Sequence, residues 1–136
     1  MKASLIILLA SVFLIAGCSK NEPAQYDALE GTGLLGKWEI QKTVVDGIAD
    51  LSAECCTFIE FNKDSQPGDL KGDFRSYGVG YETNGIFEVN TVDRTILFDY
   101  NNKQRSYVFD IEENLLALSY EDEGRQVMQT WVRVEE

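Results

Sequence analysis

Histidine is absent from the 136-residue chain, and this absence limits what its side chains could catalyse. Without an imidazole there is no Ser-His-Asp or Cys-His nucleophile system, no histidine-ligated zinc and no histidine pH switch. The carboxylates of Glu112-Glu113 and Glu121-Asp122-Glu123 stand in predicted turns, where charged groups are usually solvated. Asp64 and Asp69 flank a Pro-Gly turn, but their spacing matches no EF-hand loop. We therefore predict a protein that is not an enzyme and has no catalytic residue, metal site or cofactor.

Sulfur chemistry could come from the cysteines at positions 18, 55 and 56. Cys55 and Cys56 are neighbours, so they do not form a CxxC redox motif. Adjacent residues of a strand point to opposite faces, and we therefore expect Cys55 inside the domain and Cys56 outside it, both as small apolar residues. An intermolecular disulfide through Cys56 is the alternative in an oxidising compartment.

Cys18 ends a segment with the features of a secretory signal peptide. A single positive charge in Met1-Lys2 precedes an apolar run that is shorter than the ~20 residues needed to span a bilayer. Ile15-Ala16-Gly17-Cys18 resembles the bacterial lipobox, in which the cysteine receives a diacylglycerol before cleavage. An ordinary signal peptide with a chance cysteine is the alternative. The resemblance implies a signal peptide over residues 1–17 and a lipoprotein that is held to a membrane by lipid on Cys18.

The residues around the anchor and the overall charge narrow the location and the partners. Ser19 follows the cysteine, and the aspartate of an inner-membrane retention signal is absent there, which favours the outer membrane of a cell envelope. The periplasmic and surface faces remain alternatives. The chain carries 12 basic and 23 acidic residues, a net charge of −11, which repels nucleic acid. We expect no nucleic-acid partner.

The elements that would position any site are predicted to be strands. Residues 18–33 are polar and contain Pro23, so we expect a flexible tether there and a domain over residues 34–136. Short segments rich in β-branched and aromatic residues then alternate with turn residues. They predict strands at 36–45, 56–62, 69–76, 85–91, 95–100, 105–111, 115–120 and 125–134, with a short helical turn at 48–54 as an option. Closure removes exposed edges, so the predicted fold is an all-β, eight-stranded antiparallel up-and-down β-barrel.

Period-2 alternation assigns the inward face and raises a question about one lysine. Counting from Trp38 places Ile40, Lys42 and Val44 inside the barrel, where a bare ammonium group would be costly. Either a bulge or a snorkelling side chain returns Lys42 to water, or Lys42 binds an anionic headgroup at the open end. In the last strand two alternative sets compete for the inner face: Val127 with Trp131, and Val132 with Val134.

Four short segments between Leu35 and Val134 resemble the lipocalins and related barrels. Gly36-Lys37-Trp38 is similar to the Gly-x-Trp that opens their first strand, and Trp131-Val132-Arg133-Val134 is similar to their last strand. The segments from Tyr81 to Val89 and from Tyr107 to Leu118 look like small lipocalin-like lipoproteins of Bacteroidetes. The resemblance implies a calycin-type barrel whose closed end is sealed by Arg133 packed across Trp38.

Such a barrel is just wide enough to be filled by side chains or to hold one small ligand. The leading hypothesis is a small, partly apolar ligand bound in the barrel mouth by Lys42 and by the tyrosines at positions 77, 100, 107 and 120. A barrel filled by its phenylalanines would contradict that hypothesis. The alternative is a protein-interaction module without a small-molecule ligand, in which outer-face residues such as Phe58 and Leu97 dock onto an envelope protein.

Overall fold

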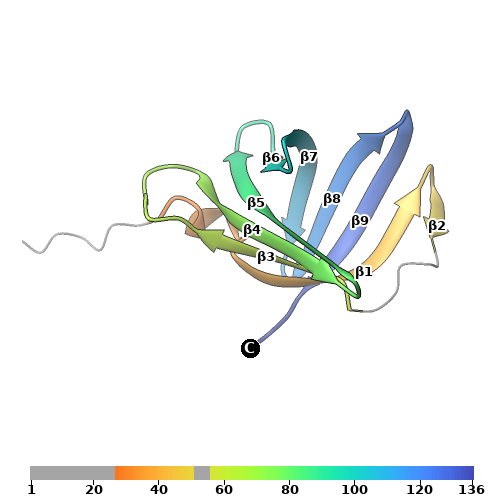
Figure 1. Cartoon of the computed structure of the whole chain (residues 1–136), viewed down its shortest axis with the longest axis horizontal. Coiled ribbons are helices and arrows are strands. Elements are labelled where there is room, and N and C mark those ends of the chain that lie inside the picture. Colours follow the sequence, from red (N-terminus) through yellow and green to blue (C-terminus); the bar gives the residue numbers. More distant parts are fainter. Residues whose placement is uncertain (1–26, 51–55) are drawn as a thin grey trace, which may run out of the picture.

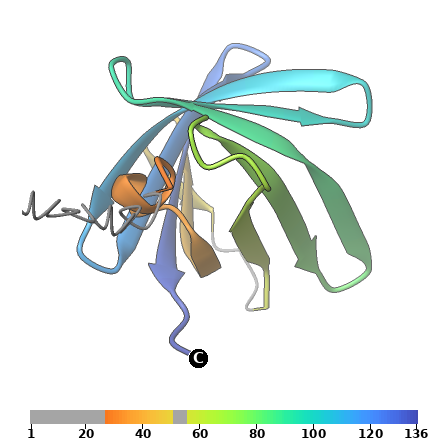
Figure 2. The same cartoon turned by 90° about the vertical axis from the view of Figure 1, so that its left-hand side faces the viewer.

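A closed ring of antiparallel strands makes up the part of the chain that the computed structural model describes, residues 27–50 and 56–136. Within these residues the elements are η1 (Glu30–Thr32), β1 (Gly36–Val45), β2 (Ile48–Asp50), β3 (Phe58–Lys63), β4 (Lys71–Gly78), β5 (Tyr81–Asn90), β6 (Thr95–Tyr100), β7 (Lys103–Glu112), β8 (Leu115–Asp122) and β9 (Arg125–Arg133). Strands β3 to β9 pair in sequence order, and β1 pairs with both β3 and β9 (Figures 1 and 2). The predicted eight-stranded barrel is confirmed.

Strand β1 closes the ring because its two halves have different partners. Its first residues pair with β3, from Gly36 opposite Phe61 to Glu39 opposite Phe58. On the other side it pairs with β9 from Trp38 to Val45. The segment Ile48–Asp50, offered above as a helical turn, is instead strand β2, which forms a hairpin with the end of β1. In the described ranges no helix is long and apolar enough to cross a membrane.

The hairpin turns have the backbone that their residues favour. Asp46-Gly47, Asn101-Asn102 and Glu123-Gly124 all have positive φ values, between 49° and 80°. Positive φ at both central residues defines the type I′ turn, whose twist matches that of the flanking strands. Asn, Asp and Gly tolerate this conformation best, so the sequence marks these turns directly.

A β-bulge in β1 corrects the predicted orientation of two residues. Ile40 pairs with Trp131 but Lys42 pairs with Thr130, so Gln41 is an extra residue in β1. One extra residue reverses the alternation that follows it. Lys42 is therefore exposed, in agreement with the bulge alternative given above, whereas Val44 faces outward opposite Met128, contrary to its predicted inward position.

The packed domain begins earlier in the chain than residue 34. Leu29 and Leu34 are fully buried, and the short helix η1 lies at one end of the barrel (Figure 2). Ala28 N donates a hydrogen bond to Pro67 O at 3.0 Å. Residues 27–33 are thus part of the barrel domain and not of the tether. The ring of pairings and its core both lie within residues 27–136, so this segment is a self-contained folding unit.

Trp38 and Arg133 seal the end of the barrel that carries η1. The guanidinium carbon of Arg133 lies 4.2 Å from the centroid of the Trp38 ring, as the resemblance implies. Arg133 also donates hydrogen bonds to Leu35 O at 2.7 Å and to Gly33 O at 2.5 Å, and Trp38 Nε1 donates to Leu34 O at 2.8 Å. These contacts join the chain before β1 to the last strand. We call this end the closed end.

Phenylalanine rings fill the half of the barrel next to the closed end. Phe61 and Phe87 are about 1% exposed and meet edge to face, with ring centroids 5.0 Å apart.

The two sets of β9 residues that competed for the inner face are now distinguished, because Val127 and Trp131 are both buried. Cys56 is exposed, as predicted, whereas Cys55 lies outside the described residues.

Candidate ligand pocket

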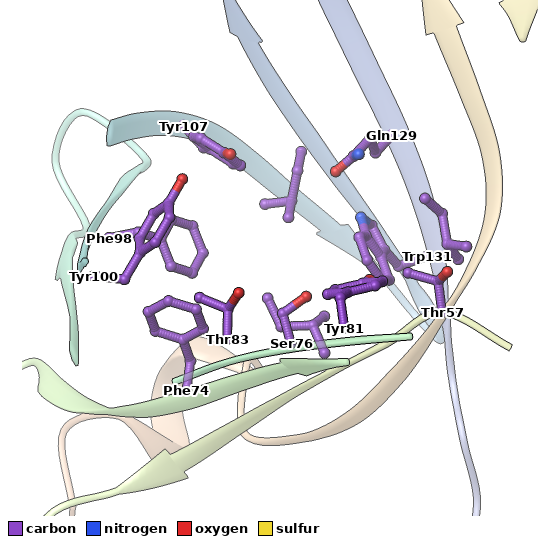
Figure 3. Close-up of a pocket in the computed structure, with 13 residues that line it drawn as sticks. Thr57, Phe74, Ser76, Tyr81, Thr83, Phe98, Tyr100, Tyr107, Gln129 and Trp131 are labelled. Carbon is purple, nitrogen blue, oxygen red and sulfur yellow. The ribbon is translucent and has the colours of Figure 1, made fainter. Parts of the chain in front are cut away.

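A pocket of about 200 Å³ occupies the half of the barrel away from the closed end. Every strand of the ring contributes to its wall, because alternate residues near this end of each strand point inward. The lining side chains, drawn in Figure 3, are Ile40, Thr57, Ile59, Phe74, Ser76, Tyr81, Thr83, Phe98, Tyr100, Tyr107, Leu118, Gln129 and Trp131. The barrel is therefore filled at one end and hollow at the other.

Aromatic rings form one side of this pocket. The Phe74 and Phe98 rings meet edge to face, with centroids 4.8 Å apart, and Phe98 and Tyr107 lie 5.0 Å apart. Tyr107 in turn stacks on Tyr120, with centroids 4.4 Å apart. The phenylalanines of the core thus continue without a break into the wall of the pocket, which offers both ring faces and ring edges to an apolar guest.

Hydroxyl, amide and indole groups are found among the rest of the lining. Ser76 and Thr83 face each other across β4 and β5, and Gln129 and Trp131 come from β9 on another side of the pocket (Figure 3). Trp131 is 4% exposed. Its Nε1 atom is buried and has no hydrogen-bond partner among the described residues. The pocket therefore combines apolar surface with a few polar groups, which is typical of small-molecule sites.

The described part of the pocket lining is uncharged. None of the described residues that line the pocket is acidic or basic. Burial, helped by the neighbouring Tyr120, raises the pKa of Tyr107 to about 12, and burial also raises the pKa of Tyr120. Tyr107 therefore stays a neutral hydroxyl at any physiological pH. Arg105 and Asp122 form an ion pair at 3.3 Å on the strands that carry these tyrosines.

Two of the predicted ligand-binding tyrosines, Tyr100 and Tyr107, line the pocket. Tyr120 lies behind Tyr107 as its stacking partner. Lys42 is exposed and is not part of the lining, because the bulge at Gln41 turns it outward. The anionic headgroup that Lys42 was expected to bind therefore has no basic partner among the described lining residues.

Tyr77 lies on the outer face of the barrel and not at its mouth. Its neighbour Ser76 faces the pocket, so alternation turns Tyr77 outward. The Tyr77 hydroxyl donates a hydrogen bond to Glu60 Oε1 at 2.7 Å, and its ring lies 5.3 Å from that of Phe58. Lys37 Nζ lies 4.4 Å from the centroid of the Phe58 ring. Phe58, proposed above as a docking residue, is therefore half-buried beneath side chains of its own domain.

Sequence reasoning missed the polar part of the lining. Ser76 lies two residues after Phe74 in β4, and Thr83 lies four residues before Phe87 in β5, so each faces the same side of its strand as that phenylalanine. Gln129 lies two residues before Trp131 in β9. Alternation alone would have assigned them to the interior. Within residues 27–50 and 56–136 no cluster of acidic or cysteine side chains could hold a metal ion. Comparison of the chain with protein-family models, curated proteins and solved structures found no match.

Proposed function

We propose that this protein is a membrane-anchored, lipocalin-like lipoprotein that binds a small, partly apolar molecule in the open half of its barrel. The observation that supports the proposal is the pocket itself. Of the barrel interior, the half at the closed end is occupied by packed side chains, whereas the other half holds about 200 Å³ of free space. Protein interiors are normally packed without such voids, so we expect a ligand to occupy this space.

The size and the lining of the pocket favour a compact ligand. Sites for drug-sized molecules usually measure roughly 300–1,000 Å³, so a volume of about 200 Å³ suits a smaller one. Ile40, Ile59 and Leu118 add aliphatic surface to that of the aromatic side chains. Binding and not catalysis is proposed, because the described lining residues include hydroxyls such as Ser76 and Thr83 but no histidine, lysine or carboxylate beside them to act as a base.

Filling the pocket is expected to abolish binding. The probe is 2-naphthol, an uncharged fluorescent molecule that is mostly apolar, titrated into the segment Ser19–Glu136. The unaltered segment should bind one equivalent saturably, and Thr83→Trp should not, because Thr83 lines the pocket and an indole there would occupy it. The matched control is Asn84→Trp, whose side chain is exposed on the opposite face of β5 and should leave binding unchanged. Equal binding by both variants would contradict the proposal.

Anchoring through Cys18 has a separate test. Cells that express the full chain are grown with labelled palmitate, and the protein is recovered and assayed for the label. We expect the unaltered chain to carry label and Cys18→Ser to carry none, because the acyl chains would be attached through that sulfur. Cys56→Ser, which alters an exposed cysteine of the barrel domain, should remain labelled. Label that persists on Cys18→Ser would contradict the anchor.

A further inference from the structure

The indole nitrogen of Trp131 is a buried hydrogen-bond donor without an acceptor in the described residues. The other tryptophan of the chain provides a contrast, because Trp38 Nε1 donates to Leu34 O at 2.8 Å. Buried donors are nearly always satisfied in native proteins, and an unsatisfied one is costly. In Figure 3 the Trp131 nitrogen lies on the pocket side of its ring, near the Gln129 side chain. An acceptor in the pocket would therefore satisfy this donor.

The charge of the ligand is limited by what surrounds that donor. The described lining residues include no lysine or arginine that could neutralise an anion, and no carboxylate that could neutralise a cation. An unpaired charge in such surroundings is strongly disfavoured. Arg105, which contacts the hydroxyl of Tyr107 from outside the lining, is already paired with Asp122. The net charge of −11 further disfavours the approach of anions.

The shape of the ligand follows from the aromatic wall. Phe74, Phe98 and Tyr107 present ring edges and faces at centroid separations of 4.8 and 5.0 Å, the spacings at which aromatic rings pack on one another. The free volume of about 200 Å³ is smaller than that of drug-sized sites. A flat molecule with few rings matches both features better than a long acyl chain does.

We propose that the pocket binds an uncharged molecule of one or two rings that bears a carbonyl or similar oxygen, which accepts a hydrogen bond from Trp131 Nε1. This inference rests on the proposed function and adds the chemical class of the ligand. Gln129 lies beside Trp131 in the lining and can contribute a second polar contact through its amide group. The aromatic side chains would then hold the ring.

Three flat probes of nearly the same shape can test the class. Acetophenone carries the acceptor oxygen, α-methylstyrene replaces it with a methylene group, and benzoate adds a negative charge. Each is titrated into the ¹⁵N-labelled segment Ser19–Glu136, whose two tryptophans give two indole N–H signals. We expect acetophenone to shift the Trp131 signal downfield and leave the Trp38 signal in place. It should bind about three- to tenfold more tightly than α-methylstyrene, and benzoate should bind most weakly.

Trp131→Phe separates the hydrogen bond from the packing. This variant keeps an aromatic ring but lacks the N–H, so its affinity for acetophenone should fall to that for α-methylstyrene. The control Tyr77→Phe removes a hydroxyl on the outer face and should change neither affinity. The comparison of probes on the unaltered protein does not depend on either variant folding.

The outcomes distinguish the ligand class from the proposed function. Equal affinity for acetophenone and α-methylstyrene without a shift of the Trp131 signal would overturn the class and leave the pocket as a binding site. If benzoate bound more tightly than the other two probes, the class would also be overturned and the pocket would remain a binding site. If neither these probes nor 2-naphthol binds, both the class and the proposed function are overturned.

Discussion

Trp38→Ala should lower the free energy of unfolding by about 3–5 kcal/mol, the usual range for removing a buried aromatic side chain. Trp38 is fully buried, and its ring packs beneath Arg133 at 4.2 Å. Truncation would open a cavity, remove the hydrogen bond from Trp38 Nε1 to Leu34 O and leave the guanidinium without its aromatic partner. Urea denaturation of the segment Ser19–Glu136, followed by far-ultraviolet circular dichroism, measures the effect.

The control for this variant is Val92→Ala. Val92 is 90% exposed in the turn between β5 and β6, so its truncation should change stability by no more than about 0.5 kcal/mol. A loss below about 1 kcal/mol for Trp38→Ala would contradict the role assigned to the closed end, because burial of an aromatic ring normally contributes more than that.

Gly72→Ala should destabilise the barrel by about 1–3 kcal/mol or more, although it adds only one methyl group. Gly72 is buried in β4 opposite Phe87, whose ring lies over it. An added Cβ would come within 2.1 Å of Asn62 O and 2.8 Å of the Phe87 ring, so backbone of β3 would have to move. The same denaturation assay applies.

Gly68→Ala is the matched control, since it makes the same chemical change where nothing lies within 4 Å of the new Cβ. Alanine there restricts the unfolded chain, so stability should stay the same or rise by up to about 1 kcal/mol. If the two variants unfold at the same urea concentration, the close packing of Phe87 on Gly72 is not important for stability.

The fold could be predicted because its strands and turns are determined by local sequence. Asp46-Gly47 and Asn101-Asn102 favour positive φ at both positions and Glu123-Gly124 at its glycine, so these turns were found without tertiary information. Phe74, Phe87 and Phe98 could likewise be assigned to the core, because each lies on the buried face of its strand, where residues alternate between the two faces.

Only part of the site could be predicted from the sequence. A bulge was suggested only by the cost of burying Lys42, and neither its position at Gln41 nor its reversal of Val44 could be predicted from local sequence. Ser76, Thr83 and Gln129 were also not predicted as lining residues, although strand alternation is consistent with their inward position. The unsatisfied Trp131 Nε1 could not be predicted at all, because it depends on which groups approach it in three dimensions.

The position of η1 has a consequence for how a guest would reach the barrel. The chain enters the domain at the closed end, where Asp27 is buried, and Cys18 lies nine residues earlier. Nine extended residues reach about 30 Å at most. The proposed lipid on Cys18 would therefore attach to the domain at its closed end, and the pocket lies in the other half of the barrel. On the proposed function, a guest would enter the barrel from the end opposite the point of attachment.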